Sequence, residues 1–314
     1  MDSGHRYSAG YVLPDDKAPY TLKVLQWNVL ADALAHNNFI KCPEDVLKWS
    51  YRGPLILEEI ICSGADIICL EEVDHFADYL EPNLSTQGFQ GLFLPKTDSA
   101  CLKFQPNYGP DGCALFFRSS MFKLIEKKEV SLKNTTGGIS NQVAMLARLG
   151  LKKSGGGEGA PSQLSIGVTH LKAKKEGRAL REAQGEHLLS EMASFAKDQY
   201  AIICGDFNAQ ADEPVYQHFT NNKAHQWLML SSTYAGSYYD QKEPPLTSWK
   251  FRENGESKYT IDYIWASMDN IGVESILKVP TMEEIGENGL PCAKYPSDHV
   301  ALCSCVTLYS KVVS

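Results

Sequence analysis

The chain has 314 residues, of which 43% are hydrophobic and 22% are charged, and its formal net charge is −8. This composition is typical of a globular protein, and no apolar run reaches the roughly 18 residues of a membrane-spanning helix, so membrane insertion is not expected. The acidic balance disfavours a protein that holds long nucleic acids by non-specific attraction, although a local basic rim could still contact RNA.

The chain is expected to have a flexible start, one folded domain and free cysteines. Residues 1–20 have neither an apolar core nor an Arg-rich amphipathic pattern, so we expect a flexible N-terminal segment. Residues 21–310 are expected to form a single catalytic domain, because strand-like runs continue to the end without an interior linker. Nine cysteines without CxxC spacing favour buried free thiols in a reducing compartment, and the Cys303–Cys305 pair fits alternation along a strand.

These features predict a cytoplasmic monomer. A longer precursor could carry an organelle signal, for example a mitochondrial one, that this chain lacks.

Strand-like runs outnumber helical patterns along the chain. Strands are predicted at residues 22–29, 66–73, 113–117, 142–151, 164–171, 201–204, 260–266 and 299–308. Helices are predicted at residues 55–62, directly after Pro54, and at 76–85 and 178–196. The Gly- and Ser-rich stretch 154–163 is expected to be a flexible surface loop. This irregular alternation favours an α+β fold of two packed sheets flanked by helices over a doubly wound parallel sheet.

Polar groups that handle metals or phosphates stand at the ends of several predicted strands. In chain order these are Asn28 in QWNVL, Glu72 in CLEEVD, His170 in VTHLKA, Asp206 and Asn208 in CGDFNA, Asp262 in TIDYI, and Asp298 and His299 in YPSDH. Each alone is a weak signal, because an Asp after a strand is commonly a turn former or helix cap. We expect one site where these strand ends converge.

The order of these motifs resembles the endonuclease/exonuclease/phosphatase superfamily. The segments GPDGCALFF (109–117), NQVA (141–144), THLKA (169–173), CGDFNA (204–209) and YPSDH (295–299) are similar to its nocturnin and deadenylase branch. The resemblance covers roughly residues 20–308 and implies a four-layer αββα sandwich.

A hard divalent cation fits this set of residues. Mg²⁺ takes oxygen ligands and keeps several waters, so one carboxylate beside a neutral amide suits it. Glu72 is the expected metal ligand with Asn28 beside it, for one or two Mg²⁺ ions that Mn²⁺ could replace. Members of the family usually have Gln where this chain has Glu71, and alternation along the strand would turn Glu71 to the opposite face. Asp74 and His75 are interpreted as a helix start and a surface neighbour.

The resemblance also implies catalytic roles. Asp206 matches the general base that activates a water, and Asn208 holds the metal, phosphate or water beside it. His170 and His299 would hydrogen-bond the phosphoryl oxygens as charge builds in the transition state, and Asp262 would orient His299. Asp298 is expected to support the same corner of the site.

Basic residues point to the substrate. A run of cations follows His170 and is expected to line the pocket mouth and hold a second phosphate: Lys172, Lys174, Lys175, Arg178 and Arg181. The resemblance implies that the phosphates of NADP(H) are bound by Lys96, Asn141, Lys172, Lys174 and Arg252.

The expected activity is therefore Mg²⁺-dependent removal of the 2′-phosphate of NADP(H), giving NAD(H) and phosphate. The alternative is a 3′-to-5′ poly(A)-specific exoribonuclease, which the same metal site would serve. A third reading, an inactive binding or regulatory module, would be marked by a lost ligand, and all the matching residues are present.

Overall fold

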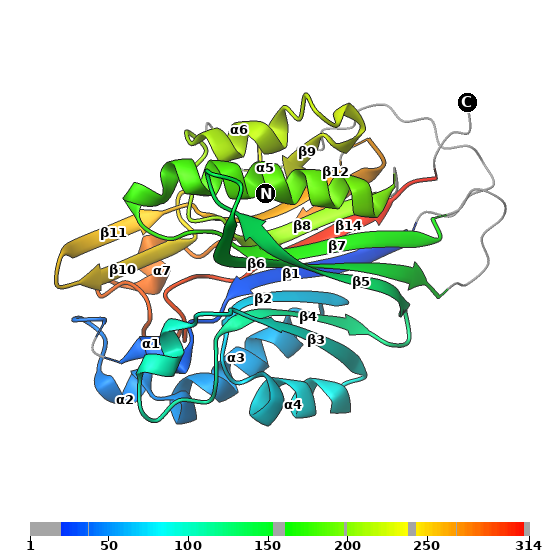
Figure 1. The fold of residues 1–314 in the computed structure, drawn as a ribbon. Helices are drawn as coiled ribbons and strands as arrows, with labels where there is room; N and C mark the ends of the chain where they lie inside the picture. The colour runs from blue at the N-terminus through cyan, green and yellow to red at the C-terminus, as the bar shows by residue number, and fades with distance from the viewer. Residues whose placement is uncertain are drawn as a thin grey trace, which may run out of the picture.

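The computed structural model describes residues 20–36, 38–152, 161–197, 200–237, 243–267 and 269–310. Two six-stranded sheets pack face to face, and helices cover both outer faces (Figure 1). The predicted α+β, four-layer αββα sandwich is thus confirmed. Nearly all of the two segments predicted to be flexible, 1–20 and 154–163, lies outside the described residues.

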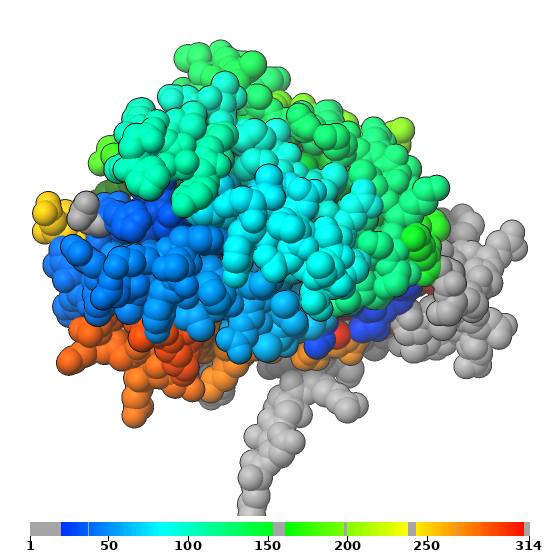
Figure 2. Space-filling view, turned by 90° about the horizontal axis from the view of Figure 1, so that it is seen from below, coloured from blue at the N-terminus to red at the C-terminus, as the bar shows by residue number. Residues whose placement is uncertain are grey.

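The first sheet contains both ends of the described chain. Its strand order is β13 (Ile271–Ile276), β14 (Leu302–Leu308), β1 (Tyr20–Asn28), β2 (Ile67–Val73), β4 (Gly112–Arg118) and β3 (Phe89–Pro95). Only β1 and β2 run parallel, and they are joined through α3 (Trp49–Cys62). The helices α3 and α4 (Glu81–Thr86) lie on the outer face of this sheet, which Figure 2 views from below as blue and cyan atoms.

The second sheet has the order β5 (Phe122–Lys133), β6 (Ile139–Leu151), β7 (Gln163–His170), β8 (Tyr200–Asp206), β12 (Asp262–Ser267) and β9 (Leu230–Ser232). Its parallel pair, β7 and β8, is joined through α5 (Arg178–Ala196). This helix matches the prediction for residues 178–196 and lies with α6 (Pro214–Thr220) on the outer face (Figure 1).

Three layers of apolar side chains hold the sandwich together. The central layer lies between the sheets and includes Val24, Ile67 and Ile166, while the opposite faces of the same strands pack against the helices. Central strands such as β8 are buried on both faces, which explains their continuous apolar sequence. Because these strands are buried along their length, their polar side chains lie at the strand ends.

Short elements complete the fold at the strand ends. They are α1 (Asp32–Ala35), α2 (Glu44–Leu47), a π-helix (Phe76–Leu80), three 3₁₀ turns (Ala100–Lys103, Lys175–Gly177 and Gln226–Leu228), the hairpin β10 (Ser248–Arg252) and β11 (Gly255–Tyr259), and α7 (Met282–Ile285). All nine cysteines fall in the described ranges and are free thiols. Among the described helices, none is long and apolar enough to cross a membrane.

Two predicted boundaries were wrong. The helix expected to begin after Pro54 begins at Trp49, so Pro54 lies inside the helix and leaves the Ser50 carbonyl without its usual N–H donor. The strand predicted from residue 299 begins at Leu302, and His299 instead forms an isolated bridge with Ser248. The second difference matters for the site, because it frees the His299 side chain from a regular sheet.

A buried carboxyl between α6 and β9 predicts a pH dependence of stability. Glu243 is 7% exposed and accepts hydrogen bonds from the Tyr216 hydroxyl (2.8 Å) and the Ser232 hydroxyl (2.9 Å). Burial raises the pKa of Glu243 from 4.5 to about 7, against the effect of both hydrogen bonds.

Because the folded state keeps this proton to a higher pH than the unfolded state, the free energy of unfolding should fall between about pH 4.5 and 7. The expected loss is roughly 3 kcal/mol, and Glu243→Gln should abolish it. Urea denaturation at several pH values measures the difference, with the exposed Glu253→Gln as the control. Identical pH profiles for wild type and Glu243→Gln would contradict this assignment.

Candidate active site

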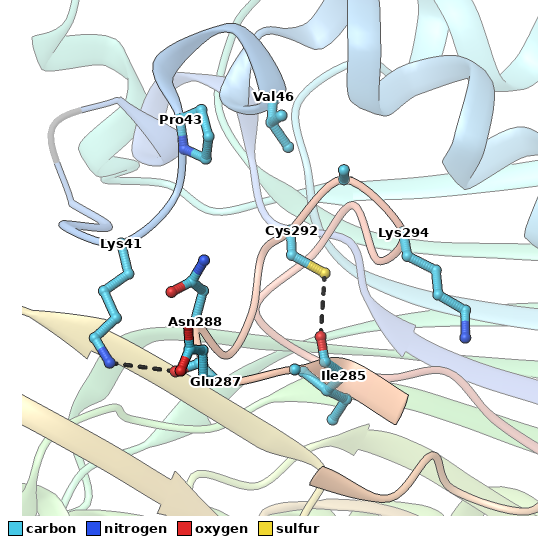
Figure 3. A pocket seen from close by; sticks show the side chains of 10 residues that line it. Lys41, Pro43, Val46, Ile285, Glu287, Asn288, Cys292 and Lys294 are labelled. Atoms are coloured by element: carbon cyan, nitrogen blue, oxygen red, sulfur yellow. Dashed lines mark hydrogen bonds between the residues drawn. The ribbon is translucent and has the colours of Figure 1, made fainter. Parts of the chain in front are cut away.

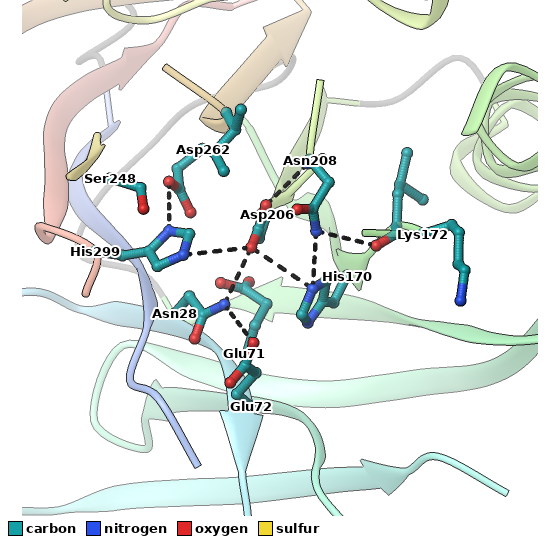
Figure 4. Close-up of polar contacts among 12 residues, drawn as sticks. Asn28, Glu71, Glu72, His170, Lys172, Asp206, Asn208, Ser248, Asp262 and His299 are labelled. Carbon is teal, nitrogen blue, oxygen red and sulfur yellow. Dashed lines mark hydrogen bonds and ion pairs between the residues drawn. The ribbon is translucent and has the colours of Figure 1, made fainter. Parts of the chain in front are cut away.

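The polar ends of five strands meet at one edge of the sandwich. The parallel strands β1 and β2 carry Asn28 and Glu72 at or next to their last residues, and the parallel strands β7 and β8 end at His170 and Asp206. Because β12 is antiparallel to β8, its first residue, Asp262, pairs with Asp206. The structure thus brings together the residues singled out from the sequence, and Figure 4 shows their side chains converging on Asp206.

Asn28 links the two sheets across this edge. Its amide nitrogen lies 3.1 Å from Glu72 Oε1 and 3.0 Å from Asp206 Oδ2, so it donates to both carboxylates. Its amide oxygen accepts the Leu30 N–H at 3.1 Å, which fixes the orientation of the amide. Asn28 therefore presents its N–H donors to the site and holds Glu72 and Asp206 near one point.

Glu72 reaches this point through an irregular backbone. Its φ is 54°, and the register between β2 and β4 shifts between Leu70 and Val73. The left-handed conformation is costly for a residue with a side chain, so the surrounding structure must enforce it. This bulge turns the Glu72 carboxylate back towards Asn28 and breaks the alternation of the strand.

The expectation that Glu71 faces away from the site was wrong, for the same reason. Glu71 is completely buried between the sheets and accepts a hydrogen bond from Gln26 Nε2 at 2.7 Å. Burial and the negative charge of Asp262 raise the pKa of Glu71 well above its usual range. This shift favours the protonated, neutral form of the Glu71 carboxyl.

Asp206 stands at the centre of the cluster and is 1% exposed. Its Oδ1 accepts the Asn208 N–H at 2.8 Å, and its Oδ2 lies 3.5 Å from His170 Nε2 and 3.7 Å from His299 Nε2. Burial, followed by the charge of Asp262, raises the pKa of Asp206 to about 7. A carboxylate with such a pKa can accept a proton near neutral pH, and a bound cation would lower the value again.

His299 is held as a cation by Asp262. The two side chains are joined by a 2.8 Å contact between His299 Nδ1 and Asp262 Oδ2. Burial alone would lower the pKa of His299, but Asp262 and Asp298 outweigh it and raise the value to about 9. His299 is therefore protonated at neutral pH and points its Nε2 towards Asp206.

Asp262 is not free to bind a metal, although its donor atoms lie within 4.8 Å of those of Asp206 and His299. Its Oδ2 also accepts the Thr247 hydroxyl at 2.6 Å, and its Oδ1 accepts Gln26 Nε2 at 3.2 Å. With both oxygens occupied, Asp262 suits the orienting role predicted for it.

His170 differs from His299 in charge. Burial and the positive charges of Lys96 and His299 keep the pKa of His170 well below its usual range. The neutral ring accepts Asn208 Nδ2 at its Nε2 (3.0 Å), and its buried Nδ1 has no hydrogen-bond partner among the described residues. With its Nε2 accepting, the neutral ring carries its N–H at the buried Nδ1.

Cations paired with buried carboxylates border the cluster. Lys96 Nζ contacts Asp111 Oδ2 at 2.6 Å, and Asp111 together with Glu72 raises the pKa of Lys96 although burial alone would lower it. On the other side, Lys250 Nζ contacts Asp298 Oδ2 at 2.5 Å, and Arg252 lies 3.7 Å from the same oxygen.

Burial would raise the pKa of Asp298, but Lys250 and His299 hold it well below the usual range. Lys250 was missed by the sequence analysis. It lies two residues before Arg252 on the same strand, so it shares a face with that predicted residue.

Three other predicted substrate residues are placed less centrally. Lys172 lies beside His170 (Figure 4), and Lys174 is exposed with a φ of 76°. Asn141 exchanges hydrogen bonds with the backbone of Asp98, at 2.8 and 2.6 Å, and so anchors the segment next to Lys96.

Arg181 does not line the pocket mouth as predicted. It is 2% exposed, forms a bidentate pair with Glu213, and donates to the carbonyl oxygens of Lys172 and Lys174. These partners neutralise the buried guanidinium, as burial of a charge requires, so Arg181 is not available to a substrate. Arg181 therefore supports the loop after His170 from beneath.

Asp74 and His75 directly precede the π-helix that begins at Phe76, as expected for a helix start, but His75 is buried and not a surface neighbour. The His75 ring stacks on Trp49 at 4.0 Å and contacts Asp78 at 2.7 Å. Asp74 accepts the Ala33 N–H at 3.1 Å. These contacts build a polar layer beneath Glu72.

Arg52 ties this layer to the active-site loops. It is completely buried and donates to the carbonyl oxygens of Val29 (3.1 Å), Leu30 (3.0 Å) and Pro296 (3.2 Å), which flank Asn28 and His299. Removing the guanidinium would leave these buried acceptors unpaired.

Arg52→Met is therefore expected to lower the free energy of unfolding by about 3–5 kcal/mol. The half-exposed pair of Arg118 with Asp66 offers a control, since Arg118→Met should cost about 1 kcal/mol. Urea denaturation of both variants gives the comparison, and equal losses would show that Arg52 does not hold the loops.

The residues present fit a divalent metal ion. Two carboxylates, Glu72 and Asp206, face one another across the Asn28 amide, and carboxylate oxygens are ligands that Mg²⁺ prefers. The positive charge of His299 would attract a phosphate, and the neutral His170 would not repel it. Glu72 is the carboxylate best placed to hold the ion, with Asn28 beside it.

A separate pocket of about 440 Å³ lies between the segment before α2 and the loop around α7. Figure 3 shows Lys41, Pro43 and Val46 facing Ile285 and Cys292 across it. In Figure 2 the corresponding blue and orange residues meet at one edge of the molecule. None of the predicted site residues lines this pocket, so it is distinct from the cluster around Asp206.

Comparison with known proteins agrees with this geometry. The profile of the Endonuclease/Exonuclease/phosphatase family matches residues 25–299. Nocturnin from Rattus norvegicus is 46% identical over 286 residues, which cover 90% of this chain and 64% of the rat protein, so the chain spans less than two thirds of that relative. The Ccr4 3′-5′-exoribonuclease subunit of the CCR4-Not complex from Candida albicans is 26% identical, covering 96% of this chain and 42% of that protein.

Comparison with solved structures also finds a nocturnin. The human nocturnin catalytic domain, solved with a bound sulfate anion, superposes with a TM-score of 0.77 at 38% identity, covering 93% of this chain and 96% of that one. The chain belongs to the endonuclease/exonuclease/phosphatase family, in its nocturnin branch.

Proposed function

We propose that this chain is a Mg²⁺-dependent phosphatase that removes the 2′-phosphate of NADP(H). The observation that supports hydrolysis most directly is the meeting of Asn28, Glu72 and Asp206 within hydrogen-bond distance, beside one cationic and one neutral histidine. Membership of the phosphoesterase family fits the same chemistry.

The proposed reaction breaks the bond between phosphorus and the ribose 2′ oxygen. Asp206 accepts a proton from a water, whose oxygen forms the new bond to phosphorus, and the departing ribose oxygen gains a proton to leave as a hydroxyl. His299, already protonated, hydrogen-bonds the phosphoryl oxygens as negative charge builds, and the ring of His170 lies on the other side of Asp206. A bound Mg²⁺ would supply further neutralisation of that charge, held by Glu72 with Asn28 beside it.

The cations around the cluster support a small, multiply phosphorylated substrate. Lys96 and Lys250 are each bound to a buried carboxylate, which keeps them at fixed positions near the site. Lys172, Lys174 and Arg252 add charge at the rim, and Asn141 holds the Lys96 segment in place. An overall charge of −8 limits this attraction to the local site, which suits a dinucleotide better than an extended RNA.

A second candidate, 3′-to-5′ exoribonuclease activity on poly(A), is favoured by the likeness to the Ccr4 exoribonuclease subunit. The same catalytic groups would serve it. The two candidates differ in the partner, a dinucleotide or an RNA chain, and not in the bond-breaking machinery.

One assay separates the candidates. The purified chain with Mg²⁺ is given NADPH and a 5′-labelled oligo(A) RNA in parallel, with Asp206→Asn as the inactive control. We expect phosphate release in equal amounts to the NADH formed, with little RNA shortening. RNA shortening without phosphate release would favour the exoribonuclease, and the absence of both activities would favour an inactive module.

A further inference from the structure

A second cluster of metal-binding side chains lies on the outer face of the second sheet, on α5 and α6 (Figure 1). Glu182 and Glu186 of α5 and His218 of α6 each offer one donor atom, and these atoms all lie within 4.8 Å of one another. His218 Nε2 is 3.2 Å from Glu182 Oε1 and 3.3 Å from Glu186 Oε1. The three side chains are 35–58% exposed, so an ion could reach them from solvent.

The two helices hold these donors in a fixed arrangement. Glu182 and Glu186 are four residues apart, so they lie one turn apart on the same face of α5. Gly185 lets α6 approach closely, because a Cβ at this position would lie 2.3 Å from Val215 Cγ2. The bidentate pair of Arg181 with Glu213 fixes the start of α6 against α5. The donors therefore come from packed helices, which position ligands more firmly than loops do.

The chemistry of the three donors points to one kind of cation. Zn²⁺ binds both imidazole and carboxylate ligands, so it fits one imidazole with two carboxylates, whereas Mg²⁺ is rarely bound by imidazole. Tetrahedral zinc bonds of about 2.0–2.1 Å separate neighbouring donor atoms by roughly 3.3 Å. The contacts of 3.2 and 3.3 Å from His218 to the two carboxylates match this spacing.

An ion pair alone accounts less well for the cluster. A single imidazole N–H can be directed well at only one acceptor, and His218 has its hydrogen bond with Glu182. A cation among the three would contact all of them and would remove the repulsion between the two carboxylates. We propose that Glu182, Glu186 and His218 form a zinc site that clamps α5 to α6, with water as a fourth ligand.

The clamp would act close to the catalytic loops in sequence. The helix α5 begins a few residues after Lys172 and Lys174, and α6 begins a few residues after Asp206 and Asn208. Zinc that joins the two helices is expected to stabilise this half of the sandwich. This inference does not depend on which phosphate ester the active site cleaves.

Zinc affinity is measured by competition with a chromophoric chelator in excess Mg²⁺, for wild type, His218→Gln and Glu186→Gln. We expect wild type to bind one more equivalent of zinc than either variant, or to hold it about a hundredfold more tightly. The matched control is His187→Gln, since His187 is also on α5 but pairs with a single carboxylate, Glu191, at 3.2 Å. This control should bind zinc as wild type does.

Hydrogen exchange gives an independent reading of the clamp. Zinc should slow amide exchange in α6 of wild type and of His187→Gln, and it should leave α6 of His218→Gln unchanged. Activity with Mg²⁺ in zinc-free buffer should be the same in all of these proteins. Equal zinc affinity and equal exchange in wild type and a folded His218→Gln or Glu186→Gln variant would overturn the proposal.

Discussion

Replacing Asp206 with Asn is expected to lower kcat for phosphate release by about 10³-fold, because the amide cannot accept a proton from the attacking water. Asn has nearly the same shape as Asp, but its amide nitrogen cannot accept a hydrogen bond, so the variant keeps the bond from the Asn208 N–H and loses the one from Asn28 Nδ2. The change also removes a buried carboxylate whose pKa is raised to about 7 by burial and by Asp262. The variant should therefore remain folded, because removing the buried charge offsets the lost hydrogen bond.

The measurement is steady-state phosphate release together with thermal unfolding of the same samples. Asp212→Asn, an exposed change six residues further on, is the control and should retain full activity. If Asp206→Asn kept more than about a tenth of the wild-type kcat, Asp206 could not be the general base.

Glu72→Gln is expected to act through the metal rather than through proton transfer. Losing the carboxylate charge should raise the Mg²⁺ concentration needed for half-maximal activity by about 10–100-fold or more. High Mg²⁺ should then restore part of the rate in Glu72→Gln and none of it in Asp206→Asn. This contrast distinguishes the two carboxylates, although the Asn28 amide bridges them.

Activity is followed as a function of Mg²⁺ concentration in both variants. The exposed Glu58→Gln on α3 is the control and should have the wild-type Mg²⁺ dependence. An unchanged Mg²⁺ requirement in Glu72→Gln would exclude Glu72 as the ligand. Glu71 would not be a ready substitute, since its carboxyl is completely buried and accepts a hydrogen bond from Gln26.

The sandwich could be predicted because the sequence patterns of its main strands and helices each lie within one short stretch of the chain. The strand β8 is recognisable from an unbroken run of apolar residues, and the helix α5 from apolar residues that recur with the helical period. The motifs at the strand ends follow the order of the family. Shorter, more exposed strands such as β10 and β11 were not found, because a hairpin outside the main sheets lacks a continuous apolar face.

The details of the site depended on features that a sequence pattern does not carry. The positive φ of Glu72 cancels the alternation that placed Glu71 on the other face. His170 and His299 look alike in sequence, but one lies among cations and the other among carboxylates, so only His299 is protonated. Arg181 and Glu213 are 32 residues apart, and their pairing removes one cation from the expected pocket.

Two supporting residues could have been found by applying the alternation of side chains along a strand to each residue that was singled out. Gln26 lies two residues before Asn28, and Lys250 lies two residues before Arg252, so each shares a strand face with a residue that was singled out. Applying the period of two around every candidate would have predicted both. Buried contacts from other elements, such as those of Arg52 from α3, have no comparable signal.

The most direct test is a crystal structure of the Asp206→Asn variant with NADP and Mn²⁺, which replaces Mg²⁺ and gives an anomalous signal. The account predicts a metal peak beside Glu72 and Asn28, with the 2′-phosphate between that peak and the rings of His170 and His299. A metal bound elsewhere, or another phosphate of the nucleotide at the metal, would contradict it.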